Sequence, residues 1–180
     1  MRSFLILVVI AISHACNPDP IDFDYPAIEF PENIQLGESE VYLNGEKVDY
    51  IPILFFDSIN NQLQAGFRFM PDFSVTNTLA FDFLPLKTGE YILHEDRILY
   101  KGAKTSLSQI VNSEFDGWEF ELVQAEKGTF NINALDTINQ TIEGYFKAYF
   151  EVIDKNGFSD TKLPEKIKFE GMFNENYFRG

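Results

Sequence analysis

The sequence predicts an all-β protein, in which a single antiparallel β-sandwich or barrel-like domain follows a signal peptide and a flexible linker. Three observations predict this. Apolar and polar residues alternate along most segments after residue 38, as they do in strands that bury one face. Turn-forming Asn, Asp and Gly residues separate these segments. Nineteen phenylalanines supply large rings for a core between sheets.

The first half of this domain begins with a hairpin. Residues Glu40–Leu43 and Glu46–Ile53 flank Asn44-Gly45, a pair that tolerates the positive φ values of a tight turn. Two alternating segments follow, and we expect one set of their residues to face the core: Leu63, Ala65, Phe67, Phe69, Leu79, Phe81 and Phe83. Tyr91–Leu93 and Ile98–Tyr100 are shorter candidate strands, whereas Thr105–Glu114 is expected to hold a helical turn.

The second half has the longest alternating run of the chain, Thr141–Ile153. Shorter runs cover Trp118–Leu122, Phe130–Ala134 and the segment that ends at Phe173. In the long run one face carries Ile142, Gly144, Phe146, Ala148, Phe150 and Val152. Many short strands of this spacing are typical of an antiparallel sandwich or barrel, and the pattern does not separate the two.

The N-terminus has the pattern of an export signal. Arg2 precedes nine unbroken apolar residues, Phe4–Ile12, and the chain turns polar directly after them. Nine residues are too short to cross about 30 Å of hydrocarbon as a helix. This pattern is typical of the apolar region of a secretory signal, and we assign it to residues 1–15.

Ala15 and Cys16, which follow that region, resemble the cleavage site of bacterial lipoproteins. Ser13 departs from the family pattern, in which Leu is usual three residues before the cysteine. The resemblance implies lipidation of Cys16, palmitate-type acyl chains, and attachment to a membrane through the N-terminal lipid. It resembles in particular the relaxed signals of Bacteroidota outer-membrane lipoproteins. The alternative is an ordinary secretory signal that leaves a free thiol.

Residues 16–37 are predicted to be an acidic, proline-rich tether, and residues 38–180 the β domain. Four prolines and five acids between Asn17 and Glu32 oppose helix formation and strand pairing. Asp19, Asp22 and Asp24 also resemble, loosely, the surface-export signals of Bacteroidota lipoproteins. The alternative is a plain hydrated linker.

Charge and composition exclude several classes of function. The formal net charge is −14, which opposes binding to nucleic acid because phosphates need a basic surface. After removal of residues 1–15 the chain keeps one histidine and one cysteine, too few for a disulfide or a structural zinc site. No nucleophile elbow or phosphate loop is present. We therefore expect no cofactor, no metal and no catalytic residues.

The C-terminal third carries a second resemblance. Gly128–Asp136 and then Ile142–Phe146 resemble a hairpin of small Bacteroidota lipoproteins of unknown function, in which a strand ending in aspartate turns into a Gly-aromatic strand. The resemblance covers about 130 residues. It implies an all-β fold and an outer-membrane location, periplasmic or surface-facing. It suggests no particular activity, because these proteins have none assigned.

Aromatic side chains are the best candidates for a ligand platform. Tyr145 and Tyr149 flank Lys147 on the face opposite the expected core, where rings could stack on sugar or peptide. The alternative is cross-strand pairing or burial under a second layer. Trp118 alternates with acids, so it is a second platform candidate or a core residue.

Two turns resemble a modification motif. Asp57-Ser58-Ile59 and Asp136-Thr137-Ile138 match the Asp-Ser/Thr-aliphatic O-glycosylation motif of Bacteroidota envelope proteins. The resemblance implies Ser58 and Thr137 as acceptor residues.

These observations predict a non-enzymatic binding or accessory lipoprotein of the cell envelope, with a glycan, a peptide or an envelope protein as its partner. Two alternatives stay open. One is a glycan hydrolase that uses paired carboxylates, for which the chain has 28 acids and no outstanding pair. The other is a lipocalin-like carrier of small molecules, although the early Gly-x-Trp signature of lipocalins is missing.

Overall fold

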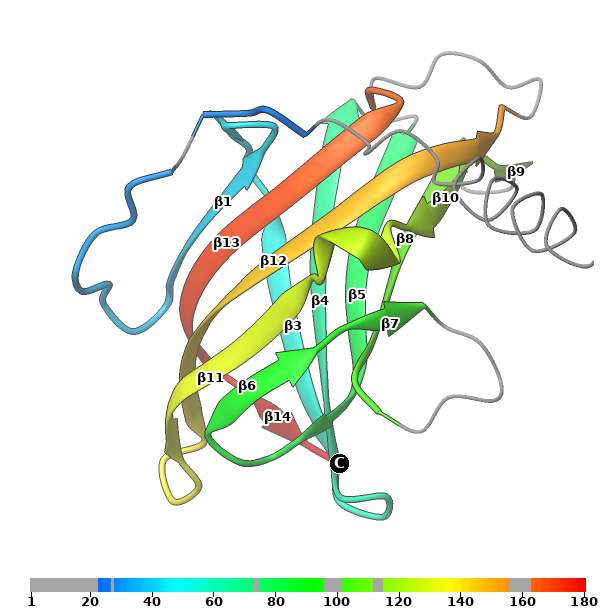
Figure 1. The fold of residues 1–180 in the computed structure, drawn as a ribbon. Coiled ribbons are helices and arrows are strands. Elements are labelled where there is room, and N and C mark those ends of the chain that lie inside the picture. The colour runs from blue at the N-terminus through cyan, green and yellow to red at the C-terminus, as the bar shows by residue number, and fades with distance from the viewer. Residues whose placement is uncertain (1–22, 27, 73–74, 96–101, 112–114, 156–162) are drawn as a thin grey trace, which may run out of the picture.

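The computed structural model describes residues 23–26, 28–72, 75–95, 102–111, 115–155 and 163–180 (Figure 1). Two seven-stranded sheets pack face to face and enclose the core between them. The all-β fold and its sandwich-like form are therefore confirmed, and the described strands do not join the sheets into one closed barrel. Among these residues no helix is long and apolar enough to cross a membrane.

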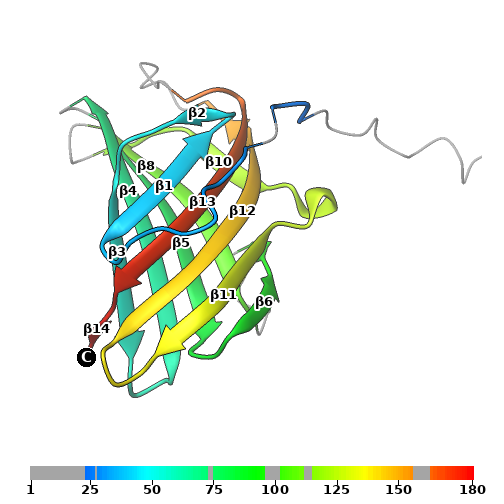
Figure 2. The same ribbon diagram turned by 90° about the vertical axis from the view of Figure 1, so that its left-hand side faces the viewer.

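The first sheet, sheet A, is antiparallel throughout and is the face turned to the viewer in Figure 2. Its strands are, in spatial order, β2 (Glu46–Lys47), β1 (Glu38–Leu43), β13 (Lys166–Asn176), β12 (Thr141–Asp154), β11 (Thr129–Asp136) and β6 (Gly89–Ile92), with β10 (Glu119–Leu122) also paired to β12. A short 3-10 helix, η1 (Gln124–Glu126), links β10 to β11.

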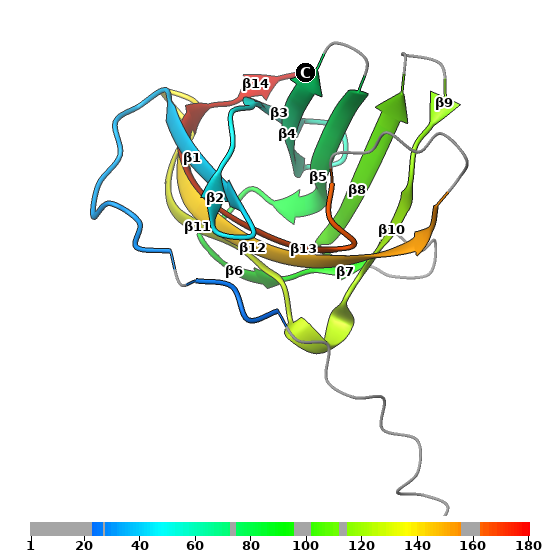
Figure 3. The same ribbon diagram turned by 90° about the horizontal axis from the view of Figure 1, so that it is seen from above.

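The second sheet, sheet B, mixes antiparallel and parallel pairs. Its strands are, in spatial order, β14 (Phe178–Arg179), β3 (Ile51–Asp57), β4 (Gln62–Asp72), β5 (Val75–Pro85), β8 (Lys104–Val111) and β7 (His94–Glu95), with β9 (Phe115–Asp116) paired to β8. The β14–β3 and β7–β8 pairs are parallel. Seen from above, both sheets curve around a common interior (Figure 3).

Phenylalanine rings fill this interior. Phe67 and Phe81 from sheet B meet Phe146 from sheet A, with ring centroids 4.6 and 4.9 Å from the Phe146 centroid. Phe130 and Phe173 extend the same cluster. Each buried ring contributes about 1.5–3 kcal/mol of hydrophobic free energy, so this cluster is the main stabilising element.

Two glycines make room for these rings. Gly144 of β12 pairs with Phe173 of β13, and Phe146 of β12 pairs with Gly171 of β13. An added Cβ at Gly171 would lie 2.4 Å from Phe146 Cζ, and one at Gly144 would lie 2.8 Å from Phe173 Cζ. Each ring therefore lies over the glycine of the neighbouring strand in the same sheet. This explains why a glycine interrupts the apolar face of each strand.

Most expected core positions are buried, and two are wrong because of β-bulges. An extra residue shifts the β4–β5 register, so that Leu63 pairs with Leu84. Phe83 adopts a φ of 59° and is exposed, and Leu84 takes the buried place. A second shift in β11 leaves Ala134 exposed.

The helical turn expected at Thr105–Glu114 is also wrong. Residues 104–111 form β8, in which Thr105, Leu107 and Gln109 are buried together. Because Thr105 and Gln109 are polar, the buried face of β8 does not appear as an alternation of apolar and polar residues in the sequence. Thr105 Oγ1 donates to Ala80 O, and Gln109 Nε2 donates to Asn77 Oδ1, so both are satisfied inside. The strand expected at Ile98–Tyr100 lies outside the described residues.

The N-terminal segment packs on the outer face of sheet A. The Phe23 ring meets Tyr149 edge-on at 5.1 Å, and Phe30 meets Tyr42 at 5.7 Å. Tyr25 Oη donates to Lys166 O over 3.2 Å, and Asn174 Nδ2 donates to Ile34 O over 3.1 Å. This differs from a hydrated spacer, because aromatic residues placed between the prolines and acids give the segment a side that packs.

The chain crosses from one sheet to the other at both lateral edges of the sandwich, here called seams. Backbone hydrogen bonds close one seam and leave the other open. At one seam buried Leu93 joins β6 to β7; its N–H donates to Gly128 O, and His94 N–H donates to Ala103 O. At the other seam β1 of sheet A and β3 of sheet B lie opposite each other and are not paired. The candidate site lies at this open seam.

Candidate ligand-binding groove

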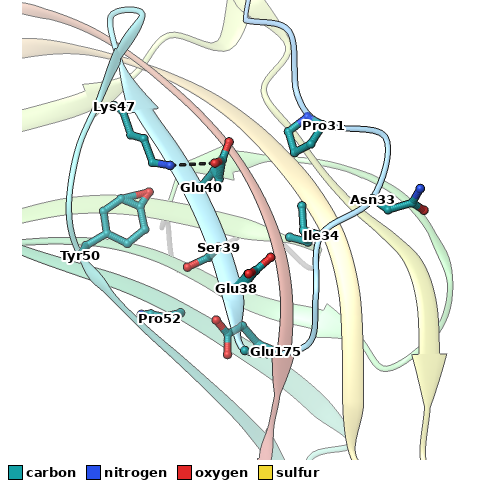
Figure 4. A pocket seen from close by; sticks show the side chains of 11 residues that line it. Pro31, Asn33, Ile34, Glu38, Ser39, Glu40, Lys47, Tyr50, Pro52 and Glu175 are labelled. Carbon is teal, nitrogen blue, oxygen red and sulfur yellow. Dashed lines mark hydrogen bonds and ion pairs between the residues drawn. The ribbon is translucent and has the colours of Figure 1, made fainter.

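A groove of about 740 Å³ lies at the β1–β3 seam (Figure 4). Its walls come from the segment before β1, from β1 itself, from β2, the start of β3 and the connection between them, and from the end of β13. The lining residues on which the argument depends are Glu38, Ser39, Glu40, Lys47, Tyr50, Pro52 and Glu175.

The groove exists because β1 is only partly covered along its free edge. Asn44 N–H donates to Lys168 O. The even-numbered residues of β1 therefore direct their backbone N–H and C=O groups toward β13. The odd-numbered residues therefore direct their backbone groups away from β13. There β2, two residues long, pairs only with Tyr42 and Leu43, and the start of β1 stays uncovered.

Polar residues take inward-facing strand positions at this seam. Ser39 precedes buried Val41 by two residues on β1, and Glu175 follows buried Phe173 by two residues on β13. Both therefore point to the side that carries the core elsewhere in the sheet. Glu38 and Glu40 alternate with Ser39 and line the groove from the other side of β1.

Tyr50 brings a buried hydroxyl to the groove. Its ring packs edge-on against core Phe67 at 5.6 Å. The hydroxyl oxygen is buried and has no hydrogen-bond partner among the described residues. Burial raises the pKa of this hydroxyl well above its ordinary value of 10.0. A buried hydroxyl without a partner costs about 1–3 kcal/mol, so a ligand group that bonded it would recover free energy.

A three-residue network fixes one side of the groove. Lys47 Nζ lies 2.7 Å from Glu40 Oε1, and Tyr42 Oη donates to Glu40 Oε2 over 3.0 Å. These two hydrogen bonds lower the pKa of Glu40 and hold it ionised. Both oxygens of this carboxylate are therefore engaged within the protein.

The remaining two carboxylates lack a cation among the described residues. Glu38 Oε2 accepts only the Gln35 N–H, over 2.8 Å. Glu175 has no described partner, and burial raises its pKa above the ordinary value of 4.5. The described residues hold no cluster of three His, Cys, Asp or Glu side chains arranged for a metal ion. The groove thus offers oxygen acceptors and negative charge.

The aromatic platform expected from the sequence is not assembled in this groove. Tyr149 is 7% exposed, since Phe23 covers its ring and Lys147 Nζ lies 5.3 Å from the ring centre. Tyr145, on the same strand face, is 38% exposed. Burial under a second layer, the alternative, therefore applies to Tyr149 alone.

Trp118 lies at the opposite seam. Its indole ring is half-buried, with Lys155 Nζ 5.4 Å from the ring centre. It lines a separate hollow of about 300 Å³ together with Gln109 and Gly117. Its Nε1 is buried and has no partner among the described residues. Trp118 therefore does not join the two tyrosines in one surface.

Ser58 and Thr137 lie in two turns of the same construction at one end of the molecule. Asp57 Oδ1 accepts the N–H groups of Ile59 and Asn60, and Asp136 Oδ1 accepts those of Ile138 and Asn139. In both turns the Asn side chain also donates to the aspartate over 2.6 Å. Both hydroxyl residues are exposed, but Ser58 Oγ donates to Gly180 O. Cys16 lies outside the described residues.

Searches against protein families, curated proteins and solved structures return no match to this chain. The case for function therefore depends on the groove itself.

Sequence reasoning missed the residues that form this groove. Ser39 and Glu175 did leave a signal, because each extends an apolar strand face by one polar residue at an inward position. Tyr50 left none, since its burial depends on the contact between the β2–β3 connection and Phe67 of β4.

Proposed function

We propose that this protein is a lipid-anchored cell-envelope lipoprotein that binds a polar ligand, without catalysis, in the groove at the β1–β3 seam. The observation that carries the binding proposal is the buried, unpartnered hydroxyl of Tyr50 at a groove whose carboxylates Glu38 and Glu175 have no cation partner among the described residues. Buried polar atoms in proteins normally have partners, and of the four buried side-chain atoms without one among the described residues, only that of Tyr50 belongs to a residue lining this groove.

The anchor part of this proposal is supported by Ala15-Cys16 and by the apolar leader before it. We propose acylation of Cys16, an outer-membrane location of the Bacteroidota type, and a ligand that is a glycan, a peptide or part of an envelope protein. Incorporation of a palmitate analogue in cells, compared with the Cys16→Ala variant, tests the anchor. Equal labelling of both proteins would contradict it.

The binding part is tested by filling the groove. Ser39→Trp places a large ring at an inward position of the open seam, where it should block the ligand and leave the far side of the sandwich intact. Pull-down of envelope glycans and proteins with both forms compares them directly. Binding that survives in the Ser39→Trp variant would place the site elsewhere.

A carboxylate-based glycan hydrolase is the second candidate, because one observation favours it. The groove holds Glu40, whose pKa is lowered, and Glu175, whose pKa is raised, and such contrasts separate a base from an acid. The binding proposal ranks first because Lys47 and Tyr42 already occupy both oxygens of Glu40. Turnover of an oligosaccharide that is abolished by Glu175→Gln would reverse this ranking.

The carrier alternative is not proposed, since aromatic rings occupy the space between the sheets where a carrier needs a hollow. O-glycosylation stays a proposal for both turns. We expect Thr137 to be modified more fully than Ser58, whose hydroxyl is bonded to Gly180 O. Intact-mass comparison of Thr137→Ala and Ser58→Ala proteins from the native host checks this, and equal mass losses would contradict it.

A further inference from the structure

The charges of the groove do not balance. Three carboxylates line it, from Glu38, Glu40 and Glu175, and its one basic side chain is Lys47. Lys47 is already paired with Glu40 at 2.7 Å. The part of the chain that the structure describes therefore leaves Glu38 and Glu175 without a counter-charge, and a cation bound there would supply it.

Three polar side chains on different elements line the groove and can accept hydrogen bonds. Glu175 comes from β13, Ser39 from β1 and Tyr50 from the connection before β3. Ser39 and Tyr50 lie on the same side of β1 in Figure 4, with Glu175 near the start of that strand. An ammonium group has three donors and no acceptor, and it accommodates separate acceptors better than a planar guanidinium does.

We infer that the ligand of this groove presents a primary ammonium group, which pairs with Glu175 and donates to the Ser39 and Tyr50 hydroxyls. This inference rests on the proposed function, because it names the chemistry of the ligand at the same site. The ammonium could come from a lysine side chain of a partner protein or from a free amine. Both sources share this chemistry, and the experiment separates them.

A side chain or small molecule fits this seam better than an added strand. Gly180 N–H donates to Phe56 O, so the even-numbered residues of β3 direct their backbone groups to its free edge. One of them is Pro52, which has no N–H to donate. β14 already pairs with Phe55 and Phe56. Few backbone groups of β3 are left for a partner strand.

The charge of the whole molecule acts in the same direction. With a net charge of −14, the protein attracts cations at long range and repels anionic ligands. Binding through this field should weaken as salt is added, because screening shortens its reach to about 10 Å at 0.1 M ionic strength.

Calorimetric titration of the purified full-length protein tests the inference. The probes are N-acetyl-lysine amide for a lysine side chain, 1,5-diaminopentane for a free amine, and N-acetyl-norleucine amide as the neutral match to lysine. Chitotetraose serves as a neutral sugar. We expect a cationic probe to bind about tenfold or more tightly than the norleucine derivative, which corresponds to about 1.4 kcal/mol.

Two variants test whether Glu175 causes the preference for a cationic probe. Glu175→Gln keeps the size of the side chain and should remove most of this preference, whereas Glu90→Gln, an exposed change on β6, should retain it. Stronger binding of the lysine derivative than of the diamine indicates a protein partner, and the reverse order a free amine. Equal binding of lysine and norleucine probes, or full binding by Glu175→Gln, overturns the inference.

The outcomes also separate this inference from the proposed function. If chitotetraose binds and Tyr50→Phe weakens it, the groove is a binding site and only the ammonium assignment is wrong. If no probe binds and Ser39→Trp changes no interaction with envelope components, the proposed function itself is wrong.

Discussion

The centre of the sandwich and its β1–β3 seam use the same inward-facing strand positions and fill them differently. On β13, Phe169, Gly171 and Phe173 face the aromatic cluster, and Glu175 continues that face into the groove. Rings pack against rings at the centre, whereas a carboxylate and two hydroxyls line the groove at the seam. The difference teaches that aromatic packing dominates the centre, whereas this seam carries carboxylates and the unpartnered Tyr50 hydroxyl, so substitutions should separate the two.

The largest effect is expected from removing a ring at the centre. Phe146→Ala should lower the free energy of unfolding by about 3–5 kcal/mol, because it leaves a cavity among Phe67, Phe81 and Phe130. Chemical denaturation measures this change. The neighbouring Tyr145→Ala, on the exposed face of the same strand, is the control and should cost far less. Equal losses would mean that the cluster is not the main stabilising element.

The next effect is expected from adding a methyl group beneath a ring. An added Cβ at Gly144 would lie 2.0 Å from Asn131 O, so Gly144→Ala should destabilise the fold by about 1–3 kcal/mol. Gly66→Ala is the matched control in β4, since its nearest neighbour would lie 3.7 Å away. A shift in the denaturation midpoint for Gly66→Ala as large as that for Gly144→Ala would contradict this account of the glycines.

At the seam, removing a side-chain group should not lower the free energy of unfolding. Tyr50→Phe removes a buried hydroxyl without a partner, so stability should stay unchanged or rise by up to about 1 kcal/mol, while ligand binding falls. Thermal unfolding with and without ligand measures both effects. A clear loss of stability in the absence of ligand would show that the hydroxyl has a structural role, and would erase the contrast between the two regions.

The smallest effect is a pH dependence. The folded-state pKa of Glu175 is raised, so the folded state holds this proton more tightly than the unfolded state does. The contribution of Glu175 to stability therefore falls as pH rises from about the ordinary value of 4.5 through the raised value. Glu40 acts in the opposite sense, because its lowered pKa makes its contribution disappear as pH falls.

Denaturation of the native protein and of Glu175→Gln across this pH range isolates the first effect. The variant should be relatively more stable at neutral pH than at acidic pH. An identical pH profile for the two proteins would mean that the Glu175 carboxyl is fully hydrated.

The sequence allowed prediction of the centre much better than of the seam. The alternation in Thr141–Ile153 located the buried face of β12, because a long strand beneath one layer of core keeps its period. In β5 a bulge at Phe83 interrupts the alternation. The local sequence does not predict this bulge, since a φ of 59° is unusual for phenylalanine.

The groove could not be predicted because its walls are joined only by tertiary pairing. Glu38 lies opposite Asn174 on β13, far away in the chain, so Glu175 reaches the groove through a register that no local pattern encodes. Likewise, no local pattern predicts that Phe23 of the tether packs against the ring of Tyr149.

If the proposed lipid anchor is present, the packing of the tether limits the distance between the domain and the membrane. If Cys16 carries the lipid, only residues 17–22 separate it from Phe23, which is already seated on sheet A. At about 3.3–3.6 Å per residue, even a fully stretched connection gives only about 20–25 Å of play. The domain would then lie within this distance of the lipid headgroups. A partner would have to reach the groove close to the bilayer surface.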